Sequence, residues 1–157
     1  MPAFSPDGKW LATNGDECRL WEVGSWRLDR VIPRGEARGN SKALAFSRDG
    51  KVLAIAYSSR VIRLVEPSTG RELATLAAPH AVGVARLCFS PDGSRLAAAC
   101  SNHVIQVWDL ARVRRGLAEM GLDWDAPPYP SVKAAAPGGR APVPLAVEIV
   151  GAAPEAK

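Results

Sequence analysis

Phe89-Ser90-Pro91-Asp92-Gly93 decides the fold, because the same pattern occurs twice more along the chain. The earlier copies are Phe4-Ser5-Pro6-Asp7-Gly8 and Phe46-Ser47-Arg48-Asp49-Gly50, at spacings of 42 and 43 residues. A second landmark follows each copy, at Trp21-Glu22, Val65-Glu66 and Trp108-Asp109, with spacings of 44 and 43 residues. Two landmarks that stay in phase over three copies indicate an internal repeat of about 43 residues.

Each repeat has the pattern of four short strands separated by tight turns. In the second copy, the segments 43–46, 52–57, 61–65 and 71–76 favour strands. The segment 52–57 is apolar throughout, which predicts a strand buried on both faces. Asp49 suits the interior of a turn, and Gly50 supplies a residue with positive φ. Four antiparallel strands in about 43 residues are typical of one blade of a β-propeller.

These residues resemble the WD-repeat (WD40) family of β-propellers. Trp108-Asp109 is the family's signature dipeptide, and the landmarks at residues 21 and 65 are degenerate forms of it. The resemblance covers residues 1 to about 110, and the Phe-Ser-Pro-Asp-Gly form is similar to the bacterial branch of the family. It implies an all-β fold, a partial WD40 β-propeller of about three four-stranded antiparallel blades. A short helix and a Pro-rich C-terminal tail follow the blades.

A further family feature is a buried chain of hydrogen bonds that runs from a His through Ser or Thr to an Asp and on to the Trp. The resemblance places His80, Asn102 and Trp108 along this chain, with Ala98 or Cys100 at the Ser/Thr position. Because Asn carries no charge, only a weaker His–Asn–Trp chain is expected, with a rigidifying role. The expected repeat-motif residues are Phe4, Asp7, Gly8, Trp21, Phe46, Asp49, Gly50, Phe89, Asp92, Gly93, His80, Asn102, Trp108 and Asp109.

The expected organisation is three blades, at residues 1–38, 39–80 and 81–110, with the last blade lacking its outer strand. Ten apolar side chains of the repeats should be buried: Phe46, Leu53, Ile62, Leu64, Leu73, Leu87, Phe89, Leu96, Ile105 and Trp108. In the first blade, Trp10, Leu20 and Trp21 should be left partly uncovered, because blades are stabilised by their neighbours.

An amphipathic helix is predicted at 111–122, with Asp109 as its N-cap and Gly121 as its stop. Its apolar stripe is expected to contain Leu110, Val113, Leu117, Ala118 and Met120. Its solvent-exposed face is expected to contain Arg112, Arg114 and Arg115. The tail, 123–157, places Trp124 in a linker and has six prolines within 127–144. The apolar run 143–150 is a candidate strand for the open edge of the third blade.

The composition excludes several classes of protein. The chain has 157 residues, 47% hydrophobic and 23% charged, which fits one domain with a tail. No apolar run approaches 18 residues and no signal peptide is visible, so no membrane association is expected. Three cysteines form no disulfide framework, which favours the cytoplasm. The net charge of +4 does not by itself argue for nucleic acid.

No constellation in the sequence points to catalysis, and neither an enzyme activity nor a cofactor is predicted. Cys88, Cys100, His80 and His103 lack the paired spacing of a zinc site, so buried cysteines and loop histidines are favoured. No nucleophile elbow, phosphate-binding loop or kinase motif occurs. The basic segment 30–42 is a candidate partner-binding loop, and because no aromatic residues interleave, nucleic acid is not favoured. The candidate partner-binding residues are Arg34, Arg38, Arg60 and His103.

Three blades are too few for a closed ring, which takes about four to eight. The expected partners are therefore other proteins or missing blades of the same propeller, encoded upstream or supplied by another chain. The predicted function is a non-catalytic protein–protein interaction scaffold, the C-terminal part of a larger propeller. The block from the helix to Pro130 is also similar to the post-propeller segment of large bacterial WD-repeat proteins, some of which carry a kinase domain. The alternative is therefore a regulatory or sensor segment of a bacterial serine/threonine kinase protein.

Overall fold

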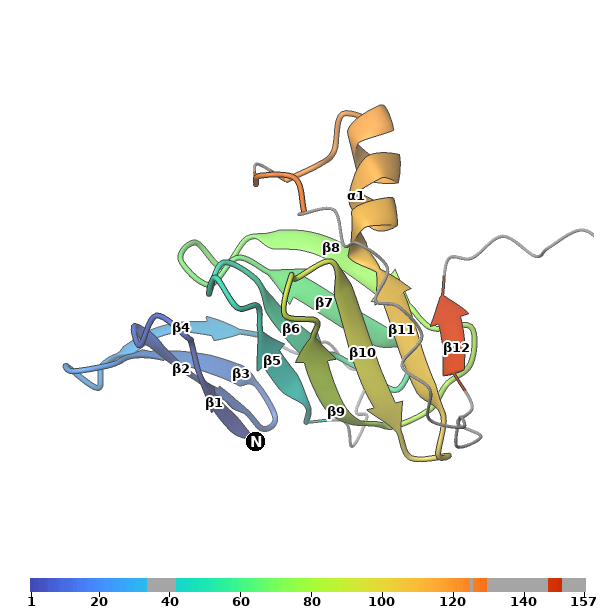
Figure 1. Cartoon of the computed structure of the whole chain (residues 1–157). Helices are drawn as coiled ribbons and strands as arrows, with labels where there is room; N and C mark the ends of the chain where they lie inside the picture. Colours follow the sequence, from blue (N-terminus) through green and yellow to red (C-terminus); the bar gives the residue numbers. More distant parts are fainter. Residues whose placement is uncertain (34–41, 125, 130–146, 151–157) are drawn as a thin grey trace, which may run out of the picture.

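The computed structural model describes residues 1–33, 42–124, 126–129 and 147–150. Within these residues the chain forms three four-stranded sheets and one helix (Figure 1). The first sheet contains β1 (Pro2–Phe4), β2 (Trp10–Asn14), β3 (Cys18–Glu22) and β4 (Leu28–Ile32). The second contains β5 (Leu44–Phe46), β6 (Leu53–Ala56), β7 (Val61–Val65) and β8 (Glu72–Ala77). The third contains β9 (Val84–Phe89), β10 (Arg95–Cys100), β11 (Ile105–Asp109) and β12 (Val147–Val150).

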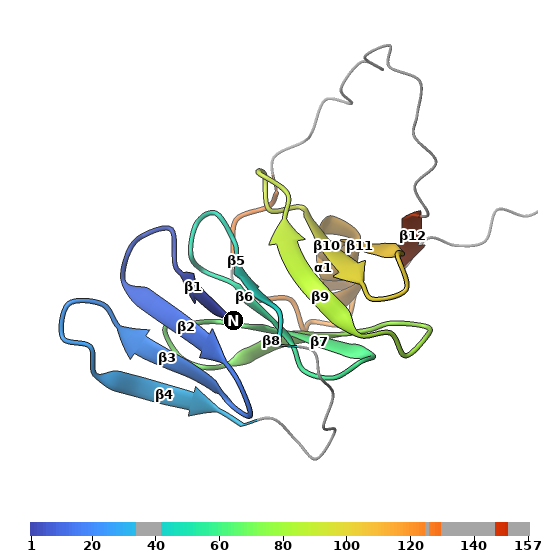
Figure 2. The same cartoon turned by 90° about the horizontal axis from the view of Figure 1, so that it is seen from below.

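The sheets stand side by side in chain order, as blades do around a propeller axis (Figure 2). The first strands of the three sheets, β1, β5 and β9, are neighbours on the inner side. The first two sheets are antiparallel meanders in which each strand pairs with the next. The predicted all-β fold, a partial propeller with one short helix, is therefore confirmed.

Two apolar cores fill the spaces between the sheets. The core between the first and second sheets is built from Ala12, Cys18, Leu20, Leu44, Leu53, Ile55 and Val65. The core between the second and third sheets is larger, and it includes Leu64, Leu96 and Trp108. All four residues of β6 are buried, as its apolar run predicts, because this strand contributes side chains to both cores.

The ten side chains expected in the core are not equally covered. Leu53, Ile62, Leu64, Leu87, Leu96 and Trp108 are buried, whereas Phe46, Leu73, Phe89 and Ile105 are only half-buried. Ile105 is half-exposed because it lies on the face of the third sheet that points away from the second sheet, and no described sheet covers that face. The expectation for Leu20 was wrong in the opposite sense: it is fully buried, because it points toward the second sheet.

The helix α1 spans Leu110–Glu119 and follows β11 directly. Asp109 is its N-cap, and the Asp109 carboxylate accepts a hydrogen bond of 2.9 Å from the Arg112 amide. At the other end Gly121 has a φ of 70°, and the amides of Gly121 and Leu122 donate to the carbonyls of Ala118 and Leu117. This Schellman arrangement closes the helix earlier than the expected limit of 122.

The apolar stripe of the helix differs from the predicted one. Met120 and Ala118 are exposed, whereas Arg114 is buried beside Leu110.

Among the described residues no helix has the length and apolar character needed to cross a membrane.

The third sheet does have a fourth strand, which the repeat region itself does not supply. β12 pairs with β11, with Ile105 opposite Val147 and Trp108 opposite Val150. The pairing is parallel, whereas β4 and β8 run antiparallel to their neighbours. The repeat region alone leaves this edge open, as expected, and Val147–Val150 of the candidate strand 143–150 covers it, although 143–146 lie outside the described residues.

Candidate functional site: the cavity between the second and third sheets

The turn after the first strand of each sheet is built in the same way. In the second sheet the Ser47 hydroxyl donates to Oδ1 of Asp49 at 2.6 Å, and its oxygen accepts from the Val52 amide at 2.9 Å. The Asp49 carboxylate also accepts from the Lys51 amide at 3.1 Å. Gly50 has a φ of 71°, a conformation that favours glycine. The serine, aspartate and glycine of the repeat are therefore turn-forming residues.

The equivalent aspartates of the other two turns are held as anions. The hydroxyl of Ser5 donates to Asp7, and the hydroxyls of Ser90 and Ser94 donate to Asp92. These hydrogen bonds hold the pKa of Asp7 and of Asp92 below the usual value. Each carboxylate thus serves its own turn and is not a free acid or base.

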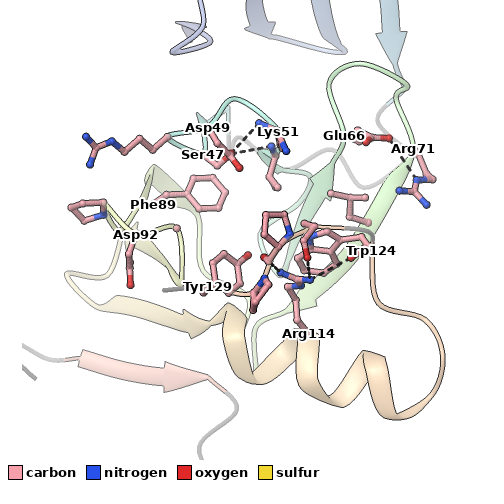
Figure 3. Close-up of a pocket in the computed structure, with 18 residues that line it drawn as sticks. Ser47, Asp49, Lys51, Glu66, Arg71, Phe89, Asp92, Arg114, Trp124 and Tyr129 are labelled. Carbon is pink, nitrogen blue, oxygen red and sulfur yellow. Dashed lines mark hydrogen bonds and ion pairs between the residues drawn. The ribbon is translucent and has the colours of Figure 1, made fainter. Parts of the chain in front are cut away.

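A cavity of about 400 Å³ lies between the turns of the second and third sheets (Figure 3). Its wall includes Lys51 from the second sheet, Phe89 and Asp92 from the third, and Trp124 and Tyr129 from the segment after the helix. The volume falls within the range of about 300–1,000 Å³ that is typical of ligand pockets. The cavity is therefore a candidate site in the described part of the chain.

The segment that covers the cavity is fixed by one buried arginine. Arg114 forms a two-pronged ion pair with Asp123, with Nε to Oδ1 at 2.9 Å and Nη2 to Oδ2 at 3.0 Å. Its guanidinium also donates to the carbonyls of Trp124, Ala126 and Pro127, at 3.4, 2.7 and 2.8 Å. Nε, Nη1 and Nη2 thus all donate to this segment and position Asp123, Trp124, Ala126 and Pro127.

Two aromatic rings complete the arrangement around Arg114. The guanidinium carbon lies 5.1 Å from the centre of the Trp124 ring and 5.3 Å from that of Tyr129, which is within the reach of cation–π attraction. Trp124 is only 5% exposed and belongs to the larger core. The pKa of Arg114 is raised, chiefly by the hydrogen bond to Asp123, and burial raises the pKa of Tyr129.

Two sequence expectations about this region were wrong. Arg114 is 8% exposed and not part of a wet helix face, and Trp124 is a core residue and not a linker residue. Arg114 could have been found from its spacing, because Leu110, Arg114 and Leu117 lie four and three residues apart on one stripe. No local signal marks Trp124, because its burial depends on the position of the helix.

The expected rigidifying chain does not form. His80 and Asn102 are exposed, and Oδ1 of Asn102 accepts from the Val104 amide. The indole Nε1 of Trp108 is buried without a hydrogen-bond partner among the described residues. The reason is that Ala98 replaces the side chain that would accept from this nitrogen.

The candidate partner-binding residues lie away from the cavity. Arg60 is in the β6–β7 loop and His103 in the β10–β11 loop, at the ends of the sheets opposite to the cavity. Both are exposed, and Arg60 donates to the carbonyl of Pro79 at 3.2 Å. Arg34 and Arg38 lie outside the described residues.

The cysteines and histidines also remain apart. Cys18 and Cys100 are buried, but Cys88 is exposed, because it lies on the uncovered face of the third sheet. The described residues contain no group of three or more His, Cys, Asp or Glu side chains that could hold a metal ion.

The comparisons with known proteins agree with this architecture. The family model described as WD domain, G-beta repeat matches residues 70–109, which run through β8, β9, β10 and β11. Residues 70–109 are thus similar to one WD40 repeat. The matched region joins the last strand of the second sheet to three strands of the third, so this match spans two blades.

Two solved structures have the same kind of fold, and one curated relative is similar in sequence. The crystal structure of the RRP9 WD40 repeats has a TM-score of 0.61 and 26% identity, over 71% of this chain and 35% of that one. The structure of U3-55K has a TM-score of 0.60 and 27% identity, over 71% and 36%. WD repeat-containing protein 1 of Bos taurus is 28% identical over 111 residues, 69% of this chain. The chain spans only 18% of the length of that relative.

Proposed function

We propose that this chain is a non-catalytic protein-interaction scaffold, a segment of a larger WD40 propeller. WD40 repeat proteins typically act as scaffolds for protein interactions, and the propellers similar to this chain are generally not enzymes. The observation that carries the proposal is the outer face of the first sheet.

One row of apolar side chains crosses that face. Phe4 pairs with Leu11, Leu11 with Trp21, and Trp21 with Leu28, so the four side chains lie on the same side of the sheet. Phe4 is 58% exposed and Leu28 45% exposed, and Val31 lies beside them at 39%. We call Phe4, Leu11, Trp21 and Leu28 the free row.

In the second sheet the equivalent row packs against a neighbouring sheet. Its equivalent residues are Phe46, Leu53 and Val65, which pair in the same register and pack against the first sheet. Leu53 and Val65 are at most 1% exposed. The free row thus has the position of a sheet-packing surface but lacks the sheet. Uncovered apolar surfaces of this kind mark protein-binding sites.

The free row predicts that the chain binds another protein surface, either a further blade of its own propeller or a partner. For the isolated chain we expect self-association that increases with concentration, measured by size-exclusion chromatography with light scattering. Leu28→Lys with Val31→Lys should give a monomer, because both residues are exposed and the lysines place charge on the interface and on the edge strand β4. Met120→Lys is the matched control, since Met120 is 64% exposed but lies on the helix.

The proposal fails if the wild-type chain is monomeric at every concentration. It also fails if the Leu28/Val31 variant associates like the wild type.

A cytoplasmic setting is also proposed, supported by the number and spacing of the three cysteines in the sequence, which do not make a disulfide framework. The C-terminal position in a larger propeller, the bacterial origin and the link to a serine/threonine kinase rest on the sequence resemblance alone.

A further inference from the structure

The three repeats differ from one another next to the cavity. The position between Ser and Asp in the turn is Pro6 in the first repeat and Pro91 in the third, but Arg48 in the second. The residue after the turn glycine is Lys9 in the first repeat, Lys51 in the second and Ser94 in the third. Arg48 and Lys51 both line the cavity. Proline suits this corner of the turn, so its replacement by arginine is not required by the fold.

The charges that line the cavity are not equally available. The carboxylates of Asp49 and Asp92 accept hydrogen bonds within their own turns. Glu66 accepts from Thr69 and pairs with Arg71 at 3.7 Å. Neither Arg48 nor Lys51 forms an ion pair with any residue that the structure describes. The charged side chains at the rim of the cavity that form no described ion pair or hydrogen bond, Arg48 and Lys51, are therefore both positive.

The remaining wall is apolar and firmly positioned. Phe89 and Leu73 come from the third and second sheets, and Trp124 and Tyr129 come from the segment that Arg114 holds. Figure 3 shows Phe89 and Tyr129 on the side of the third sheet and Lys51 near the turn of the second. A side chain that enters here meets surfaces that are already ordered, which lowers the entropic cost of binding.

We propose that this cavity binds an acidic peptide segment of a partner protein through one apolar anchor residue. The anchor side chain packs against Phe89, Trp124 and Tyr129, and flanking carboxylates of the peptide face Arg48 and Lys51. A nucleic acid fits less well, because its phosphates follow one another along the whole strand and some would face the three carboxylates in the wall, whereas a peptide can place its carboxylates at Arg48 and Lys51. This assignment rests on the proposed function as an interaction scaffold, and it names the partner chemistry of one site.

The test is fluorescence polarisation with a labelled peptide, Gly-Asp-Glu-Phe-Glu-Asp-Gly, on the full chain. We expect saturable binding that weakens at least about tenfold when Phe is replaced by Gly, because the anchor loses its apolar contact. The peptide in which Lys replaces every acidic residue should not bind. Arg48→Glu with Lys51→Glu should weaken binding at least about tenfold, because attraction becomes repulsion at both positions.

The matched control is Lys9→Glu with Arg27→Glu. Lys9 is the repeat equivalent of Lys51, both control residues are exposed, and the change in net charge is the same. This variant should bind as the wild type does. Equal loss in both variants would reduce the effect to overall charge and overturn the proposal, as would tighter binding of a single-stranded oligonucleotide or the absence of saturable binding.

The result can be separated from that of the free row. If no peptide binds while the chain still associates through Leu28 and Val31, only the proposal that the cavity binds a peptide is wrong. If the peptide binds to a chain that never associates, the proposed role of the free row is wrong and the proposed peptide binding by the cavity is supported.

Discussion

The indole Nε1 of Trp21 donates a hydrogen bond of 3.2 Å to Oγ1 of Thr13, on the neighbouring strand of the same sheet. In the third sheet the repeat equivalents are Trp108 and Ala98, and the same nitrogen is buried without a partner among the described residues. The second sheet avoids the problem, because Val65 and Ile55 stand at these positions. The tryptophan ring and the hydroxyl that accepts from its indole nitrogen therefore occur together in the first sheet, whereas the third sheet has the ring without the acceptor.

Restoring the acceptor should stabilise the protein. Ala98→Ser places a hydroxyl where Thr13 has one, and we expect the free energy of unfolding to rise by about 1 kcal/mol, the net value of a typical hydrogen bond. The denaturant midpoint at unchanged slope measures this effect. Thr13→Val is the reciprocal control and should lower the stability by about the same amount. A lower midpoint for Ala98→Ser would mean that the core has no room for the hydroxyl.

Replacing Trp124 should be as damaging as replacing Trp108. Both are at most 5% exposed and belong to one core, so Trp124→Ala and Trp108→Ala should each cost about 3–5 kcal/mol. This revises the expectation from sequence, in which Trp124 mattered less. Trp26→Ala, at a residue 58% exposed, should change the stability by less than about 0.5 kcal/mol. A small loss at Trp124, measured by urea unfolding, would show that the segment 123–129 is not anchored.

The ion pair between Arg114 and Asp123 should make stability depend on acid pH. The hydrogen bond from Arg114 lowers the pKa of Asp123 in the folded protein. Because this pKa is depressed, its stabilisation is complete above the unfolded value of about 3.9 and is lost as pH falls through the lower folded value. Thermal midpoints should therefore fall less steeply below about pH 4 in Asp123→Asn than in the wild type.

At neutral pH the Asp123→Asn protein should be less stable, because a buried guanidinium loses its countercharge. Asp16→Asn, at an exposed carboxylate, serves as the control for the loss of one negative charge and should leave the neutral stability unchanged. Identical acid slopes in the wild type and in Asp123→Asn would contradict the assignment.

A strained tryptophan gives the fourth prediction. Trp26 has a φ of 55°, and the same loop position in the second sheet is Gly70, with a φ of 76°. Both amides donate to the carbonyl of the glutamate four residues earlier, so the two loops have the same shape. Trp26→Gly should raise the stability by up to about 1 kcal/mol, since glycine adopts this conformation without strain.

Gly70→Ala is the converse change and should lower the stability by about 1 kcal/mol. Calorimetric melting temperatures of the two variants should thus move in opposite directions. A destabilising Trp26→Gly would indicate that the exposed ring contributes packing that outweighs the strain.

The sequence predicted the features that repeat. The turns after Phe4, Phe46 and Phe89, the doubly buried β6 and the cap at Asp109 follow from local rules of periodicity and turn chemistry. It could not predict features that occur once. The burial of Trp124 and the role of Arg114 depend on how the helix lies across two sheets, which no period in the sequence encodes. The cavity belongs to this second class, because its wall combines turns of two sheets with Trp124 and Tyr129, which lie more than 30 residues further along the chain.

The direction of β12 has a consequence for chain polarity. β8 ends at the side of the sheets where β9 begins, so six residues carry the chain from one blade to the next. Because β12 runs parallel to β11, the backbone at Val150 points the other way, toward the side of the Ser-x-Asp-Gly turns. A blade built after this point would need a connection that first recrosses the full length of a strand. The parallel strand therefore makes the two ends of the row of blades different. A further blade can be added beside the first sheet, whereas the chain turns back at the third sheet.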